Sequence, residues 1–204
     1  MRTLNAQTSP VADGPVPARD ARPQARTLGG VFEHWAQVQP NHPAILHDGR
    51  SISFAELRDQ ALTIARSLLE LGIRKGDRVG VLLANQPEWV AMAVGTAVIG
   101  AVFVPLNTWY KRSELVWTVR HCGISTLVCM DQFLKQDFGA MLLEAFPGLA
   151  QATPGELRLD ECPTLRSITV IGRGVPGTFT WSQFLRFGDA QAPGVEQQAL
   201  ASVT

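Results

Sequence analysis

Residues 76–107 read GDRVGVLLANQPEWVAMAVGTAVIGAVFVPLN, and this stretch decides the class of fold. The apolar run at 79–83 does not alternate with polar residues, which is typical of a strand buried on both faces of a parallel sheet. Pro87 suits the first turn of a helix, and Glu88 beside it complements the helix dipole. A second apolar run at 101–106 predicts another buried strand, so the stretch indicates a strand–helix–strand unit.

The segments before this unit carry helix, turn and capping signals. An amphipathic helix is predicted from residue 28 up to Pro40, with Val31, Phe32, Trp35 and Val38 on its apolar face. Asp48-Gly49 predicts a tight hairpin, and Ser53 with Glu56 has the spacing of a capping box that opens a long helix. The buried face of that helix is expected to consist of Leu57, Ala61, Ile64, Ala65, Leu68 and Leu71.

The segments after the unit continue the alternation of strands and helices. Strands are predicted at 125–130 and 165–172, and helices at 113–123, 131–148 and 180–188, with Asp131 as the N-cap of the second helix. Small residues on the central helix are expected to let it pack closely on the sheet: Ala91, Ala93, Gly95 and Ala97. The pattern predicts an α/β fold with a mostly parallel sheet flanked by helices, where ligands bind at the carboxyl ends of the strands.

Composition divides the chain into a tail and a domain. Residues 1–27 are rich in Pro, Ala, Arg and Gln and are expected to be disordered, while residues 28–204 form the folded portion. Eighteen basic and eighteen acidic side chains give a formal net charge of zero. No overall basic field is therefore available for nucleic acid, and we expect small-molecule or protein partners.

Cysteine usage and apolar patterning indicate a cytoplasmic protein. An odd, sparse set of cysteines without a C-x-x-C pair fits a reducing compartment: Cys122, Cys129 and Cys162. The longest apolar stretch, residues 89–106, is interrupted by Gly95 and Gly100, so a buried helix and a strand are expected rather than a membrane span. The first residues lack the charged-then-apolar order of a signal peptide.

The sequence GRGVPG at 172–177 matches a dinucleotide-binding fingerprint literally. That fingerprint requires a glycine loop that opens directly into a long helix. Pro176 and the β-favouring TFTW that follows oppose such a helix. We therefore interpret GRGVPG as a surface loop, and a dinucleotide-binding oxidoreductase is disfavoured.

Other catalytic and metal-binding patterns are missing. The chain contains no G-x-x-x-x-G-K-[ST] loop and no G-x-S-x-G elbow, and its three lysines, Lys75, Lys111 and Lys135, adjoin no glycine-rich cradle. His121 and Cys122 are neighbours on a predicted helix and cannot face each other. The remaining histidines have no metal-ligand spacing: His34, His42 and His47. We expect neither catalytic residues nor metal ligands.

Aromatic residues follow the strand end at Pro105. Trp109 and Tyr110 fall in the predicted loop, where pockets form in this class of fold. They are the substrate-proximal candidates, although packing of the loop onto the core is the simpler interpretation. Trp117 is expected to lie in the core.

The ordered set of segments resembles the adenylate-forming enzymes, which include acyl-CoA synthetases and AMP-dependent ligases. The resemblance rests on the hairpin with ISFAEL, on GIRKGDRVGVLLANQPEWV, and on GAVFVPLN followed by SELVWTVRHCG. It covers about residues 28–188. It implies a reaction in which a carboxylic acid attacks the α-phosphate of ATP with Mg²⁺, after which coenzyme A displaces AMP.

The chain departs from that family's pattern at its end. The Ser/Thr/Gly-rich loop ending in Pro-Lys-Gly does not occur in the 204 residues, nor do the later ATP-binding segments or the catalytic lysine. No position here inherits those roles. We expect the N-terminal portion of an adenylation domain, inactive by itself and with apolar surface exposed. The alternative is a non-catalytic α/β binding or scaffold module.

Overall fold

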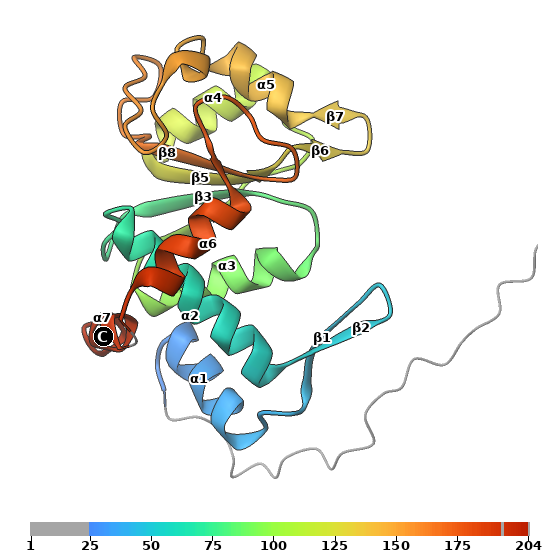
Figure 1. Cartoon of the computed structure of the whole chain (residues 1–204), viewed down its shortest axis with the longest axis vertical. Helices are drawn as coiled ribbons and strands as arrows, with labels where there is room; N and C mark the ends of the chain where they lie inside the picture. The colour runs from blue at the N-terminus through green and yellow to red at the C-terminus, as the bar shows by residue number, and fades with distance from the viewer. Residues whose placement is uncertain (1–24, 193, 204) are drawn as a thin grey trace, which may run out of the picture.

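The computed structural model describes residues 25–192 and 194–203. Its centre is a five-stranded sheet in the order β4-β3-β5-β8-β9, and every neighbouring pair is parallel (Figure 1). The strands are β3 (Arg78–Leu82), β4 (Val102–Pro105), β5 (Ile124–Met130), β8 (Ser167–Ile171) and β9 (Phe179–Thr180). The predicted α/β fold is confirmed. Residues 1–24 of the predicted tail lie outside the described residues.

Helices cover both faces of the sheet (Figure 1). One face carries α4 (Arg112–His121) and α5 (Phe138–Ala145), and the other carries α2 (Phe54–Glu70), α3 (Pro87–Val98) and α6 (Trp181–Ala190). Outside the second layer lie α1 (Leu28–Val38) and α7 (Val195–Ala201). The smaller elements are β1 (Pro43–His47), β2 (Arg50–Ser53), β6 (Gln132–Phe133), β7 (Gln136–Asp137) and η2 (Leu149–Gln151). Among the described helices, none has the length and apolar character needed to span a membrane.

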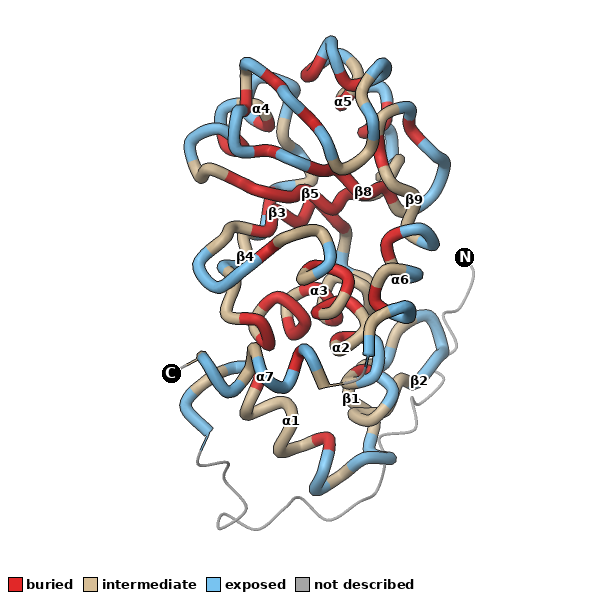
Figure 2. Tube along the Cα trace, turned by 60° about the vertical axis from the view of Figure 1, so that its left-hand side comes forward, coloured by how far each residue is buried: buried red, intermediate tan, exposed pale blue. Residues whose placement is uncertain are grey.

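Two apolar cores fill the space between the sheet and its helices, as the buried segments in Figure 2 show. The core under α4 and α5 contains Phe138 and Phe146, and the core under α2, α3 and α6 contains Met92 and Phe184. The central strands β3, β5 and β8 are buried on both faces, with β5 fully buried except at its last residue. The continuous apolar runs of the sequence therefore identified the central strands correctly.

The turn and capping signals before the sheet are confirmed. Asp48 and Gly49 have φ values of 47° and 73°, as a tight hairpin turn requires. The Ser53 hydroxyl accepts the amide N–H of Glu56, whose carboxylate accepts the amide N–H of Ser53 in return. On α2, every residue of the predicted face is buried except Leu71, which is half-buried.

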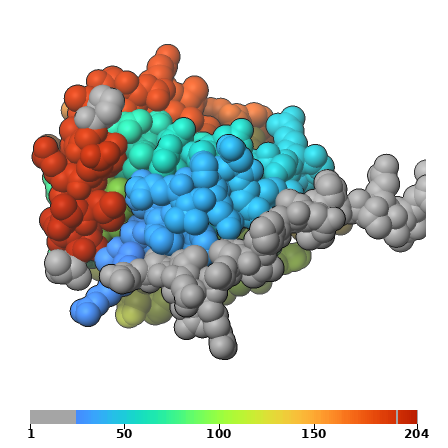
Figure 3. All heavy atoms as spheres, turned by 90° about the horizontal axis from the view of Figure 1, so that it is seen from below, coloured from blue at the N-terminus to red at the C-terminus, as the bar shows by residue number. Residues whose placement is uncertain are grey.

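The first and last described helices meet at the bottom of the molecule. In Figure 3 the C-terminal segment lies beside the first helix, and a Cβ added to Gly29 would lie 3.2 Å from Leu200 Cδ1. The predicted apolar face of α1 is only half right, because Val38 is 49% exposed and the buried positions are Gly29 and Ala36. An outer-layer helix covers other helices rather than the sheet and buries a narrower stripe.

The central unit differs from the expectations at two points. The strand β4 is not buried, because it forms the edge of the sheet, where Val102 is 47% exposed. An edge also explains why Pro105, which lacks an amide N–H, is tolerated there. The small residues of α3 do not pack on the sheet alone. A Cβ at Gly95 would lie 2.7 Å from the carbonyl oxygen of Ala61, so α3 also packs closely on α2 there.

The predicted helix at 131–148 begins later than expected. A short hairpin of β6 and β7 comes first, and Asp137 rather than Asp131 caps α5 by accepting the amide N–H of Ala140 at 2.9 Å. The carbonyl oxygen of Asp131 instead accepts the amide N–H groups of Phe138 and Gly139. Residues 191–204, expected to be a linker or the start of another element, contain α7.

Candidate functional site

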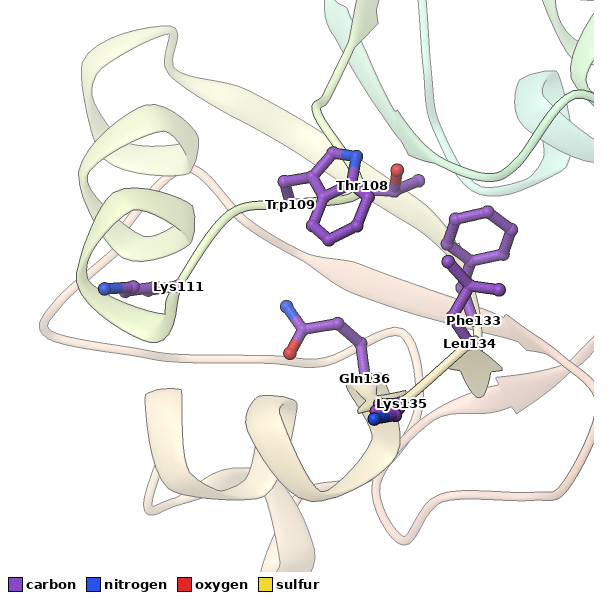
Figure 4. Close-up of a pocket in the computed structure, with 7 residues that line it drawn as sticks. All are labelled: Thr108, Trp109, Lys111, Phe133, Leu134, Lys135 and Gln136. Atoms are coloured by element: carbon purple, nitrogen blue, oxygen red, sulfur yellow. The ribbon is translucent and has the colours of Figure 1, made fainter.

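A hollow lies between two connections at the carboxyl ends of the strands. The loop after β4 forms one wall, and the hairpin of β6 and β7 after β5 forms the other (Figure 4). The hollow has a volume of about 570 Å³ and is lined by Thr108, Trp109, Lys111, Phe133, Leu134, Lys135 and Gln136. We call it the loop–hairpin hollow.

Hydrogen bonds fix the loop wall. The side-chain oxygen of Asn107 accepts the amide N–H of Trp109 at 2.9 Å, and its carbonyl oxygen accepts the amide N–H of Tyr110 at 3.1 Å. The side-chain Nε2 of Gln136 donates to the carbonyl oxygen of Tyr110 at 3.1 Å, which ties the loop to the hairpin. The two walls therefore hold a defined separation, while the Trp109 side chain is left 72% exposed.

The hairpin wall carries an exposed, strained residue. Leu134 has a φ of 53° and is 67% exposed. A leucine in the left-handed region is uncommon outside tight turns and costs free energy there. Next to it, Phe133 is half-buried against the core below α5.

The loop–hairpin hollow has a positive rim. Within residues 25–192 and 194–203, the ammonium groups of Lys111 and Lys135 have no hydrogen-bond or ion-pair partner, whereas that of Lys75 donates to the carbonyl oxygen of Ser202 at 2.8 Å. The nearby acids are engaged elsewhere. Glu114 accepts the amide N–H of Lys111, and Asp137 caps α5 and contacts a guanidinium.

The predicted site residues fall in different places. Trp109 lines the hollow, whereas Tyr110 packs on the core with its carbonyl oxygen directed to the hairpin. Trp117, expected in the core, is 62% exposed and stacks on His121 at a ring-centroid distance of 4.4 Å. That expectation is wrong because α4 buries Leu115, Thr118 and Val119. Trp117 is two positions from both Leu115 and Val119, which places it on the other side of the helix.

Sequence reasoning missed the hairpin side of the hollow. Phe133, Leu134 and Lys135 were expected within a helix, so their apolar and charged side chains were not seen as one surface. The only indication of a hairpin in DQFLKQDF is that polar residues separate its apolar residues. That spacing is also compatible with an amphipathic helix.

The cysteines and histidines of the described residues are not gathered as a metal site would require. Within the described ranges, no three His, Cys, Asp or Glu residues lie together in a way that would hold a metal ion. Burial raises the pKa of the Cys129 thiol to about 12 and that of Cys162 to about 11. Neither thiol is therefore ionised near neutral pH, and Cys122 is half-buried at the end of α4.

The GRGVPG segment is a loop, as expected. It leads into the short strand β9, and α6 begins only at Trp181. Asp131 anchors it by accepting both the amide N–H and the Nε–H of Arg173, at 3.1 and 2.8 Å. The guanidinium of Arg173 lowers the pKa of the Asp131 carboxyl, although burial opposes this effect.

A second hollow of about 480 Å³ lies among α2, α3 and α6. Its lining combines apolar side chains with three acids and includes Ile64, Ala91, Trp181, Leu185, Asp59, Glu88 and Asp189. We call it the helical hollow. Its walls are regular helices rather than the strand-end loops at which ligands bind in doubly wound sheets.

Comparisons with known proteins agree with this arrangement. The chain is 32% identical over 180 residues to the medium-chain acyl-CoA ligase ACSF2, mitochondrial, of Rattus norvegicus, and 33% identical over 179 residues to that of Mus musculus. Each match covers 87% of this chain and 28% of the relative, so the chain spans less than a third of their length.

A solved structure shares both fold and sequence with the chain. The anthranilate CoA ligase AuaEII, solved in complex with anthranoyl-AMP, superposes with a TM-score of 0.65 at 27% identity. That match covers 78% of this chain and 28% of the ligase. The family model for AMP-binding enzymes matches residues 32–173, which is more than half of the chain. The chain belongs to the AMP-binding enzyme family.

Proposed function

We propose that the chain is the N-terminal portion of the adenylation domain of an acid–CoA ligase. In the complete protein, a carboxylic acid would react with ATP to give an acyl-adenylate, and the thiol of coenzyme A would then displace AMP. The observation that carries this proposal is the family match over residues 32–173, together with relatives that are named acyl-CoA or CoA ligases.

The residues of this chain do not fit the phosphate chemistry of that reaction. Polyphosphate transfer needs a backbone cradle, Mg²⁺ ligands and a lysine that balances charge in the transition state. The 204 residues contain no Gly-rich loop ending in Pro-Lys-Gly, and the described ones form no group of three metal-ligating side chains. We therefore assign no ATP, Mg²⁺ or coenzyme A ligand here and propose that the chain alone does not adenylate.

The contribution of this chain is proposed to lie at the carboxyl ends of its strands. Trp109 presents its indole ring to the loop–hairpin hollow, and Tyr110 holds the hairpin through its carbonyl oxygen. These contacts support the proposal that both residues lie near the substrate, Trp109 by its side chain and Tyr110 by positioning the second wall.

Acid-dependent exchange between ATP and pyrophosphate tests the proposed function. We expect the complete protein to exchange label with at least one member of a panel of aliphatic and aromatic acids. The 204-residue chain should give no more exchange than a blank without protein. No exchange by the complete protein with any acid would contradict the ligase proposal, and acid-dependent exchange by this chain would contradict its inactivity.

A non-catalytic α/β binding or scaffold module is the second candidate. It is favoured by the loop–hairpin hollow, which residues of this chain alone line and which needs no ATP. The codons after Thr204 distinguish the two. A Gly-rich run ending in Pro-Lys-Gly in the same frame supports the ligase, whereas its absence supports the module.

The cellular location and the lack of a nucleic-acid partner stay predictions. The rat and mouse relatives are named mitochondrial, so a cytoplasmic location requires its own test. A balanced charge of eighteen basic and eighteen acidic side chains supports the expectation that nucleic acid is not bound.

A further inference from the structure

The hairpin of β6 and β7 leaves the sheet and returns to it at Asp131, the residue directly after β5. The amide N–H of Asp131 donates to the carbonyl oxygen of Ile171 at 2.9 Å, which continues the pairing of β5 with β8. Its own carbonyl oxygen accepts the amide N–H groups of Phe138 and Gly139, at 2.8 and 3.1 Å. Both ends of the hairpin are therefore closed on the backbone of Asp131.

The side chain of Arg173, the second residue of GRGVPG, connects the two ends of this hairpin. Its Nε–H donates to the carboxylate of Asp131 at 2.8 Å, and its Nη2 donates to the carboxylate of Asp137 at 3.4 Å. The amide N–H of Arg173 donates to the same oxygen of Asp131 at 3.1 Å. Because a guanidinium holds its donors in a rigid fork, Arg173 fixes the position of the two carboxylates relative to each other.

Gly172 allows the GRGVPG loop to come this close to the hairpin. Its φ of 111° lies in the region that favours glycine, and a Cβ at this position would overlap Oδ1 of Asp131. Gly174 in the same loop has more space, since a Cβ there would lie 3.7 Å from Thr180 Cγ2. The close approach is therefore specific to the position beside Asp131.

The stability of the fold does not account for these contacts. The Arg173 side chain is 65% exposed and that of Asp137 is 50% exposed, and ion pairs between exposed groups add little to the free energy of folding. The contacts act instead on the placement of the hairpin, whose Phe133 and Leu134 belong to one wall of the loop–hairpin hollow.

A second contact holds the same hairpin from the loop after β4, because Gln136 Nε2 donates to the carbonyl oxygen of Tyr110. The hairpin is thus attached to the connections that follow β4 and β8. Of these two attachments, only the one through Arg173 comes from a residue outside the lining of the hollow and its adjoining loop.

We propose that Arg173 is a positioning residue for the loop–hairpin hollow. It holds the hairpin of β6 and β7 in the orientation that places Phe133 and Leu134 on the second wall, so the GRGVPG loop serves the hollow without lining it. The placement of the hairpin is a property of this chain and needs no reaction. Only its consequence for acid binding rests on the proposed function.

Amide hydrogen exchange of the 204-residue chain, followed by NMR, tests the positioning. In Arg173→Gln the amides of Phe138 and Gly139 should exchange about fivefold faster than in the parent chain, as expected for the loss of partly exposed charged contacts. The amides of β3 should exchange as before. Arg173→Lys keeps the charge but not the fork, so it should restore only part of the protection.

Arg166→Gln is the matched control for the loss of a surface arginine. Arg166 lies 3.5 Å from Asp77 just before β8 and β3, at the opposite ends of the strands, and is 48% exposed. Its replacement should leave amide exchange in the hairpin unchanged. Unchanged exchange in Arg173→Gln, or equal acceleration in Arg166→Gln, would overturn the proposal.

Two glycine variants test the approach of the loop without removing the guanidinium. Gly172→Ala displaces the carboxylate of Asp131 and should accelerate amide exchange in the hairpin as Arg173→Gln does, whereas Gly174→Ala should not. Equal exchange in the two glycine variants would contradict the proposal. Thermal melting verifies that each variant is folded, and if Gly172→Ala is not, the comparison of Arg173→Gln with Arg166→Gln still decides the outcome.

Steady-state kinetics of the complete protein test the consequence for the hollow. With an acid that supports ATP–pyrophosphate exchange, Arg173→Gln should raise the KM for that acid at least about threefold and leave kcat and the KM for ATP within about twofold, since a displaced wall weakens uniform binding. A merely structural role would lower the amount of folded enzyme, and so the apparent kcat, at unchanged KM. That result would contradict a positioning role.

The two experiments separate this inference from the ligase proposal. Faster amide exchange in the hairpin of Arg173→Gln, with no acid supporting ATP–pyrophosphate exchange in the complete protein, would overturn only the ligase proposal. Ligase activity in the complete protein, with unchanged amide exchange in the hairpin of Arg173→Gln, would overturn only the positioning role.

Discussion

The two hollows of this molecule have similar volumes, about 570 and 480 Å³, but opposite charges and different walls. Loops at the carboxyl ends of the strands build the loop–hairpin hollow, which has two lysines and no acid on its lining. Three helices build the helical hollow, which has three acids and no lysine or arginine on its lining. Volume alone therefore does not distinguish a site from a gap between packed helices.

The difference lies in what the surrounding residues do for the fold. Around the helical hollow, α2 and α6 approach so closely that a Cβ at Gly188 would lie 2.1 Å from the carbonyl oxygen of Thr63. Around the loop–hairpin hollow, Trp109 and Leu134 are mostly exposed. Substitutions beside the helical hollow should therefore affect stability, and those in the loop–hairpin hollow should affect binding.

The largest effect is expected at the contact between α2 and α6. Gly188→Ala places a methyl group against the backbone of α2, which cannot move without unpacking the helix. We expect the free energy of unfolding to fall by about 4 kcal/mol, as for severe overpacking. Chemical denaturation measures this. Gly174→Ala is the matched control, since its new methyl group would lie 3.7 Å from Thr180 Cγ2, an ordinary contact. Equal stability of the two variants would show that α6 is not closely packed on α2.

The next largest effect is expected at the ion pair that holds α7. Arg66 donates to Glu196 at 3.2 Å and to the carbonyl oxygen of Gly188 at 2.8 Å, and the Glu196 side chain is 3% exposed. Arg66→Met leaves this carboxylate buried without a cation, which should lower the free energy of unfolding by about 3 kcal/mol.

The surface pair of Arg58 and Asp59 is the control for that change. Asp59 is 68% exposed, so Arg58→Met should cost less than about 1 kcal/mol in the same denaturation experiment. Adding Glu196→Gln to Arg66→Met should restore part of the lost stability. A double variant that is as unstable as Arg66→Met would mean that the carboxylate charge is not the cause.

Small effects on stability are expected in the loop–hairpin hollow. Trp109→Ala and Leu134→Asn should each change the free energy of unfolding by no more than about 0.5 kcal/mol, because both side chains are mostly exposed. Both should lower the fluorescence of a dye that binds apolar surface. A loss of stability comparable to that of Arg66→Met would show that these residues serve the fold.

The smallest effect is expected at Asp131, where Arg173 lowers the pKa of the carboxyl from its ordinary value of 3.8. A lowered pKa in the folded state contributes stability above pH 3.8, and this contribution disappears as the pH falls through the lower folded value. Arg173→Gln should raise the pKa of Asp131 and make the chain slightly less sensitive to acid. Carboxyl ¹³C NMR titration measures the pKa, and an unchanged value would exclude Arg173 as the cause.

The sequence predicted the central elements because their signals are local and redundant. The capping box of Ser53 and Glu56 and the turn at Asp48-Gly49 each depend on a few neighbouring residues, and both are present in the structure. The burial of β4 and the position of Trp117 were wrong because they depend on strand order and on which helix face meets the sheet. These are tertiary properties that a periodic pattern does not encode.

The candidate site was only half predicted for the same kind of reason. Trp109 was expected in the loop after a strand end. The hairpin residues on the other wall belong to a segment whose pattern predicted a helix. The turn at Leu134 has a left-handed backbone but contains neither glycine nor asparagine, so its residue types did not predict a turn. The two lysines line one hollow only because β4 and β5 end at the same edge of the sheet.

A residue-resolved NMR titration of the 204-residue chain with decanoate tests the central claim most directly, which is that the strand-end hollow is the functional one. We predict amide shift changes that saturate together at Trp109, Lys111, Leu134 and Gln136, with the amides of Asp59, Glu88 and Asp189 unchanged. Changes centred on the helical hollow, or scattered without saturation over both regions, would contradict the account.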